Sequence, residues 1–123
     1  MSRRWGVCSA LVLAAGAFPA QAADGAGFDT SSQVYRCTGG ARLPVVYLNI
    51  KGGDSFATTY VNGHLVLMKN GPTGSGARYY AVDESASYRW HVKGDLGNLF
   101  FQGSEPGARE TLVLQNCKAQ AQP

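Results

Sequence analysis

Two short glycine-rich segments contain the side chains best suited to chemistry. In residues 70–77, Ser75 lies between two glycines, and in residues 90–95, Lys93 directly precedes a glycine. Glycine lets the backbone approach another surface closely, and the serine hydroxyl can both donate and accept hydrogen bonds. The lysine ammonium is a compact positive charge that can pair with a carboxylate. A solvated hairpin loop and a solvated strand end are the alternatives.

Catalysis by these residues is not expected. A serine nucleophile needs a base, a group that orients the base and an oxyanion hole, and no nucleophile elbow or acidic partner has a recognisable spacing. Residues 70–77 also lack the lysine and second hydroxyl of a phosphate-binding loop. Cys37, His64, His91 and Cys117 are too widely spaced to indicate a metal site, and His91 is expected at the surface. The sequence therefore predicts a non-enzyme without metal or cofactor.

The first residues are typical of a secretory signal peptide rather than of a fold. Two arginines precede an apolar run over residues 5–18, and Ala-Gln-Ala follows at 20–22. We expect cleavage after residue 22. The apolar run is too short for a membrane span, and Cys8 lies too early in it for lipid attachment. These features predict a periplasmic protein without a membrane anchor.

The mature chain is expected to be one small domain with one disulfide. Removing 22 of 123 residues leaves 101, and removing two arginines changes 11 basic against 8 acidic residues to 9 against 8. The remaining cations are scattered, so nucleic acid is not an expected partner. Cys37 and Cys117 remain in a compartment that permits disulfides, and we predict that they pair. Closing a loop of about 80 residues would stabilise the fold by on the order of 4 to 5 kcal/mol.

Strands are the elements that must position the two loops. Residues 23–32 show no periodicity and are expected to be a flexible lead-in, 33–118 the folded domain and 119–123 a tail. Short alternating runs separated by Gly, Asn and Pro predict eight strands near residues 33–37, 43–49, 55–60, 64–69, 78–83, 88–93, 98–102 and 111–117. Asn62-Gly63 is the strongest hairpin signal. Short connections favour a small eight-stranded antiparallel β-barrel, with a β-sandwich as the alternative.

Several motifs resemble those of the bacterial periplasmic and membrane-bound inhibitors of c-type lysozyme. The resemblance covers roughly residues 34–117 and rests on four elements in this order: Tyr35-x-Cys37, Ser75-Gly76-x-x-Tyr79, Trp90-x-x-Lys93-Gly94-x-x-Gly97-x-Leu99 and Cys117. Gly97 stands where the family commonly has alanine. The misplaced Cys8 makes the chain similar to the periplasmic branch.

The resemblance implies a fold, a partner and a site. Members of this family fold as small eight-stranded antiparallel barrels, and the serine and lysine of the two motifs enter the lysozyme cleft. The implied lysozyme-binding residues here are Ser75, Lys93, Gly74, Gly76, Tyr79 and Gly94. Tyr79 could equally be only a barrel-wall aromatic. Family members vary in oligomeric state, so a homodimer is left open. The alternative function is a small periplasmic barrel that binds a ligand or serves an envelope complex.

Overall fold

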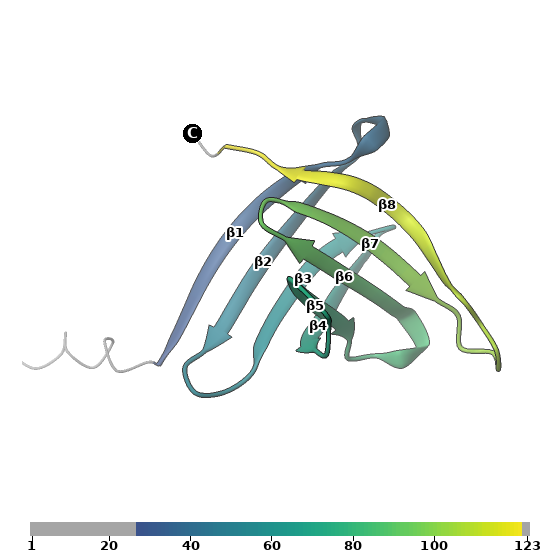
Figure 1. Cartoon of the computed structure of the whole chain (residues 1–123), viewed down its shortest axis with the longest axis horizontal. Helices are drawn as coiled ribbons and strands as arrows, with labels where there is room; N and C mark the ends of the chain where they lie inside the picture. The colour runs from purple at the N-terminus through teal and green to yellow at the C-terminus, as the bar shows by residue number, and fades with distance from the viewer. Residues whose placement is uncertain (1–26, 122–123) are drawn as a thin grey trace, which may run out of the picture.

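Short turns connect eight strands in the computed structural model, which describes residues 27–121 (Figure 1). The strands are β1 (Phe28–Arg36), β2 (Arg42–Ile50), β3 (Ser55–Val61), β4 (His64–Gly71), β5 (Ala77–Ala81), β6 (Ser87–Lys93), β7 (Leu96–Gln102) and β8 (Glu110–Ala119). Consecutive strands pair antiparallel, and β1 pairs with β8 to close a barrel. The predicted eight-stranded antiparallel barrel is confirmed and the sandwich alternative is wrong. Helical structure in the described residues is limited to two 3₁₀ turns, η2 (Thr38–Gly40) and η3 (Glu84–Ala86).

The N-terminal part of the barrel begins earlier than the sequence indicated. Residues 1–26, which include the predicted signal peptide, lie outside the described residues. The expectation of a flexible lead-in up to residue 32 is wrong from Phe28 onward, because β1 already pairs there with Ile50 of β2. The side chains of residues 28–32 are all exposed. Backbone hydrogen bonds to β2 hold this part of β1. Because none of its side chains is buried, its sequence shows no alternation of apolar and polar residues.

Large side chains fill the barrel interior. Trp90, Leu43, Met68 and Leu99 are all less than 2% exposed. The indole Nε1 of Trp90 donates a hydrogen bond to the Tyr47 hydroxyl at 2.9 Å, and the hydroxyls of Tyr47 and Tyr35 are 2.7 Å apart. Burial, and next the hydrogen bond with Tyr35, raise the pKa of Tyr47, so its hydroxyl stays protonated at neutral pH. The interior is a packed core in which the polar groups of Trp90, Tyr47 and Tyr35 are paired with one another.

Two glycines, Gly63 and Gly97, have different roles in the barrel. Asn62 and Gly63 have φ of +51° and +78° between the paired residues Val61 and His64, as predicted for a two-residue turn. β7 begins at Leu96, two residues before the strand that the sequence predicts near residues 98–102. Gly97 is a buried strand residue, and a Cβ there would overlap the Trp90 ring. Packing against the indole therefore requires a glycine at this position.

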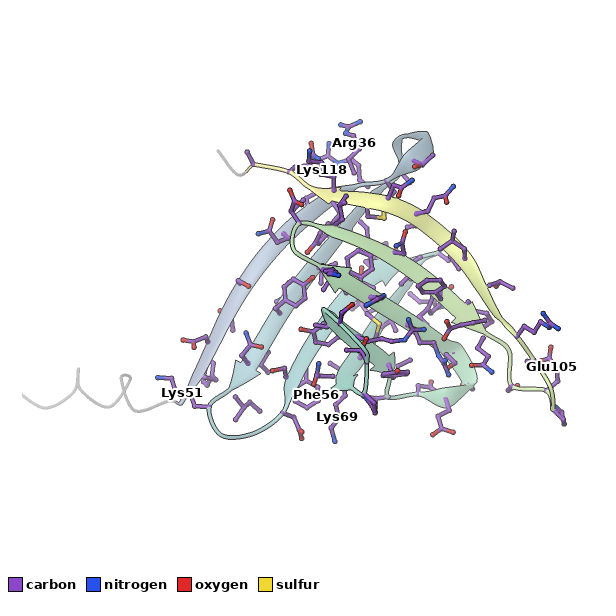
Figure 2. All side chains as sticks on the ribbon, viewed as in Figure 1. Arg36, Lys51, Phe56, Lys69, Glu105 and Lys118 are labelled. Atoms are coloured by element: carbon purple, nitrogen blue, oxygen red, sulfur yellow. A yellow bond between two sulfur atoms is a disulfide. The ribbon has the colours of Figure 1, made fainter. Side chains whose placement is uncertain are left out.

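The barrel closes along a short seam between β1 and β8. Only Tyr35–Ala119 and Arg36–Lys118 are in register across it, although the Gln120 amide also donates to the Val34 carbonyl at 2.9 Å. Figure 2 shows Arg36 and Lys118 together at this end of the barrel. The predicted disulfide is confirmed: Cys37 and Cys117 are bonded, and both are buried. The bond covalently ties the two strands at the seam.

Candidate functional site

The two glycine-rich segments meet at one end of β5 and β6. The connection 72–76 leads into β5, and Lys93 ends β6 just before the turn at Gly94 and Asp95. The first register pair between these strands, Ala77–Val92, sets the end of the loop beside the end of β6. The strand pairing therefore determines that the Ser75 loop and Lys93 are neighbours.

Gly76 makes this neighbourhood unusually close. Its φ is +70°, and a Cβ built on it would lie 2.5 Å from the Val92 carbonyl oxygen and 3.1 Å from Lys93 Cβ. Side chains larger than hydrogen do not fit there without movement, and residues other than glycine rarely adopt this φ. Gly76 is thereby held against the backbone of Lys93, and Ser75 directly precedes it in the chain.

The loop is also held by side-chain hydrogen bonds. The Tyr80 hydroxyl donates to the Pro72 carbonyl at 2.7 Å, and the Thr73 hydroxyl donates to the Ser75 carbonyl at 3.1 Å. The same Ser75 carbonyl lies 2.9 Å from Nε2 of His91. The imidazole thus binds the Ser75 backbone rather than its hydroxyl, an arrangement that shapes the loop instead of activating a nucleophile.

The exposed groups at this end include a hydroxyl, glycines and an ammonium. Ser75, Gly74, Gly76, Lys93 and Gly94 are all exposed. The three ion pairs in the described part of the chain, Lys69–Asp54, Arg78–Glu110 and Arg89–Glu110, do not include Lys93. The ammonium of Lys93 therefore has no internal carboxylate partner among residues 27–121 and is available to an external one.

Tyr79 lies in a different environment from the other predicted site residues. It is 7% exposed, faces the barrel interior, and has its ring centroid 5.7 Å from that of Tyr47. Burial, and next the proximity of Tyr47, raise the pKa of the Tyr79 hydroxyl. Its place in the fold is that of a wall aromatic that supports β5 from inside.

Sequence reasoning missed an ionic cluster beside the loop. Glu110 at the start of β8 accepts hydrogen bonds from Arg78 of β5 at 2.5 Å and Arg89 of β6 at 2.7 Å. Partial burial raises the pKa of Glu110, but the hydrogen bonds and charges of the two guanidinium groups outweigh it and lower the pKa overall. Arg78 also lies over the rings of Tyr80 and Phe100, at 5.5 and 5.0 Å from their centroids. Strand alternation places these residues on the outer face, but no sequence signal indicates that they meet.

Metal ligands do not cluster in the described part of the chain. Residues 27–121 contain no group of three or more His, Cys, Asp or Glu side chains that could hold a metal ion. Among the helices described, none has the length and apolar character needed to cross a membrane.

Sequence comparisons point to one family. The model of the family described as membrane-bound lysozyme-inhibitor of c-type lysozyme matches residues 35–107, which include both loops. The membrane-bound lysozyme inhibitor of C-type lysozyme from Pseudomonas aeruginosa is 37% identical over 81 residues, which are 63% of this chain and 60% of that protein. The chain thus spans about 60% of the length of this curated relative.

Comparison with solved structures gives the same barrel. The chain is similar to PliC-St, the periplasmic lysozyme inhibitor of C-type lysozyme from Salmonella typhimurium, with a TM-score of 0.63 and 25% identity over 75% of this chain and 99% of that one. It is also similar to Pseudomonas aeruginosa MliC, solved in complex with hen egg white lysozyme, with a TM-score of 0.54 and 28% identity over 89% of this chain and 100% of that one.

Proposed function

Because this chain belongs to the family of membrane-bound lysozyme inhibitors of c-type lysozyme, we propose that it inhibits a c-type lysozyme by inserting Ser75 and Lys93 into the active-site cleft. The observation that carries the proposal is the packing of Gly76 on Lys93, with a gap of only 3.1 Å from an added Cβ to the lysine Cβ. This packing brings two exposed groups to one edge of the molecule: the Ser75 hydroxyl and the Lys93 ammonium, which has no ion-pair partner among residues 27–121. The complex of the Pseudomonas aeruginosa relative with hen egg white lysozyme supports the choice of partner.

The target's chemistry explains why an ammonium would inhibit it. A retaining glycosidase uses two facing carboxyl groups, one protonated as the acid and one ionised. The Lys93 ammonium would pair with the ionised carboxylate and lower the pKa of the acid, while the Ser75 hydroxyl bonds a neighbouring oxygen. The cleft would then be blocked, and its acid would be in the wrong protonation state. In this function the chain acts as an inhibitor and not as an enzyme.

The glycines and Tyr79 have supporting parts in this proposal. Gly74, Gly76 and Gly94 let the backbone come close to the cleft walls because they carry no side chain. Tyr79 contributes from inside the barrel by holding β5 under the loop. Since three side chains already hold the loop, little conformational entropy would be lost on binding.

The proposal includes secretion to the periplasm, where the inhibitor would protect peptidoglycan. Cleavage after residue 22 leaves a net charge near +1, from 9 basic and 8 acidic residues. Lysozymes of this type are usually basic, so we expect little electrostatic steering and an association rate that changes weakly with salt. A homodimer stays a prediction that sedimentation analysis of the secreted form would test.

The alternative function, a small periplasmic barrel that binds a ligand, has no support from the barrel interior. The interior of the described barrel is filled by side chains such as Trp90 and Met68, both fully buried. An accessory role in an envelope complex would leave the Ser75 and Lys93 arrangement unexplained.

Substitution of Lys93 tests the proposed function. In a peptidoglycan lysis assay with hen egg white lysozyme, we expect the secreted form to inhibit and Lys93→Ala to raise the Kd by about 30-fold or more, since truncating one partner of a desolvated charge pair costs about 2 kcal/mol or more. Lys51→Ala is the matched control, because Lys51 is also exposed and lies on the separate β2–β3 hairpin (Figure 2). Equal inhibition by wild type and Lys93→Ala would refute the role of the ammonium.

A further inference from the structure

His91 connects the two halves of the candidate site. It lies on β6, opposite Arg78 of β5 and Asn98 of β7, on the outer face of the barrel. Its Nε2 is 2.9 Å from the carbonyl oxygen of Ser75, a residue 16 positions earlier in the chain. The contact therefore joins the serine loop to the strand that carries Lys93.

The other two loop contacts do not make this connection. The hydrogen bonds of Tyr80 to Pro72 and of Thr73 to Ser75 lie within the β4–β5 hairpin itself. The ladder between β4 and β5 ends at the pair Gly71–Arg78. Among the described side-chain hydrogen bonds of the loop, that of His91 is the one that reaches β6.

The acceptor determines the protonation of one nitrogen of the imidazole. A carbonyl oxygen can only accept a hydrogen bond, so Nε2 must carry a proton. This condition is met by the Nε2–H tautomer of the neutral ring and by the imidazolium. In both forms His91 donates to Ser75.

We propose that His91 is a positioning residue that clamps the backbone of the Ser75 loop to β6, the strand that ends at Lys93, before lysozyme arrives. The inference rests on the proposed function for its effect on inhibition. The clamp itself concerns only the free protein. Gly76 allows the loop to approach Lys93, and His91 keeps it there.

Loss of the clamp should weaken binding without unfolding the barrel. The half-buried His91 ring packs outside the core, so its removal leaves the interior intact. The freed loop would have to be ordered on binding, and a single net hydrogen bond corresponds to about a three- to tenfold change in Kd. We expect this change in His91→Leu.

A conservative variant separates positioning from general structure. In His91→Gln the side-chain amide N–H can donate to the Ser75 carbonyl, so we expect most of the affinity to return. His64→Leu is the matched control, because His64 is exposed and follows the Asn62-Gly63 turn. We expect the Kd of this control to equal that of the wild type.

Measurements on the free protein test the clamp independently of lysozyme. Nitrogen-15 NMR should show a proton on Nε2 of His91, and backbone order parameters of residues 73–76 should fall in His91→Leu and recover in His91→Gln. An unprotonated Nε2, or unchanged order parameters in His91→Leu, would overturn the inference. If the wild type does not bind lysozyme but the loop loosens in His91→Leu, the clamp stands and the proposed function fails.

Discussion

Gly76→Ala tests the geometry on which the candidate site depends. The new Cβ would start 2.5 Å from the Val92 carbonyl oxygen, and ordinary contact begins at 3.4 Å, so the loop must move by about 0.9 Å. Alanine also pays about 1 to 2 kcal/mol for φ of +70°. Crowding against a backbone carbonyl adds a penalty of about 1 to 3 kcal/mol. Together these penalties should lower the free energy of unfolding by about 2 to 5 kcal/mol.

The displacement should weaken inhibition as well as stability. Movement of the loop carries Ser75 away from Lys93, and a site that is about 1 Å too loose binds poorly. We expect a Kd for lysozyme at least tenfold above that of the wild type. Denaturant unfolding measures the first effect, and titration of peptidoglycan lysis at a temperature where the variant is folded measures the second.

Substitutions at two other glycines separate the cost of the positive φ from the cost of crowding. Gly107 has φ of +79° and open space around its Cβ position, so Gly107→Ala should show the backbone cost alone and wild-type inhibition. Gly74 has open space and no positive φ, so Gly74→Ala should leave the free energy of unfolding near that of the wild type. If Gly76→Ala folds normally and its Kd stays within twofold of the wild-type value, the close packing of the loop on Lys93 does not matter for binding and the reasoning is refuted.

Two further predictions concern the charged groups of the barrel wall. Because Arg78 and Arg89 lower the pKa of Glu110, its contribution to stability is complete above the usual carboxyl pKa and is lost as the pH falls through the lower folded value. As the pH falls through this acidic range, the free energy of unfolding measured in urea should therefore decrease more steeply for the wild type than for Glu110→Gln. An equal decrease in the two proteins would contradict the ionic cluster. At the seam, Arg36 and Lys118 are like charges in register, so Lys118→Glu should raise the free energy of unfolding by about 0.2 to 1 kcal/mol. The gain should shrink in concentrated salt, and an unchanged or reduced stability at low salt would show that the two charges do not interact.

Local patterns were sufficient for the strand count and for several side-chain directions. In residues 88–92 large apolar residues alternate with polar ones, and the structure buries Tyr88 and Trp90 and leaves Arg89 and His91 on the outer face. Asn62-Gly63 formed the predicted turn because its requirement for positive φ is local. The two loop motifs identified the segments that the strand register then brought together.

Other features depend on partners that lie far away in the sequence. The sequence of residues 28–32 contains no strand signal, because backbone bonds to β2 alone hold it. Gly97 lies outside the strand predicted near residues 98–102, and only the position of the Trp90 ring shows why it is a glycine in a strand. Glu110 meets Arg78 across 32 residues, a contact that no spacing rule anticipates.

The sequence by itself determined the number of strands and most of their extent, where the tightest turn falls, and that a hydroxyl and an ammonium each stand in a glycine-rich segment. Periodicity and backbone conformational preference act over a few residues and can be recognised in a single chain. Only the tertiary structure decided that Tyr79 faces inward, that His91 holds the Ser75 carbonyl, and that Gly76 lies against Lys93. These contacts arise from the register of β5 on β6 in the closed barrel, and that register is selected by the packing of all eight strands around one core.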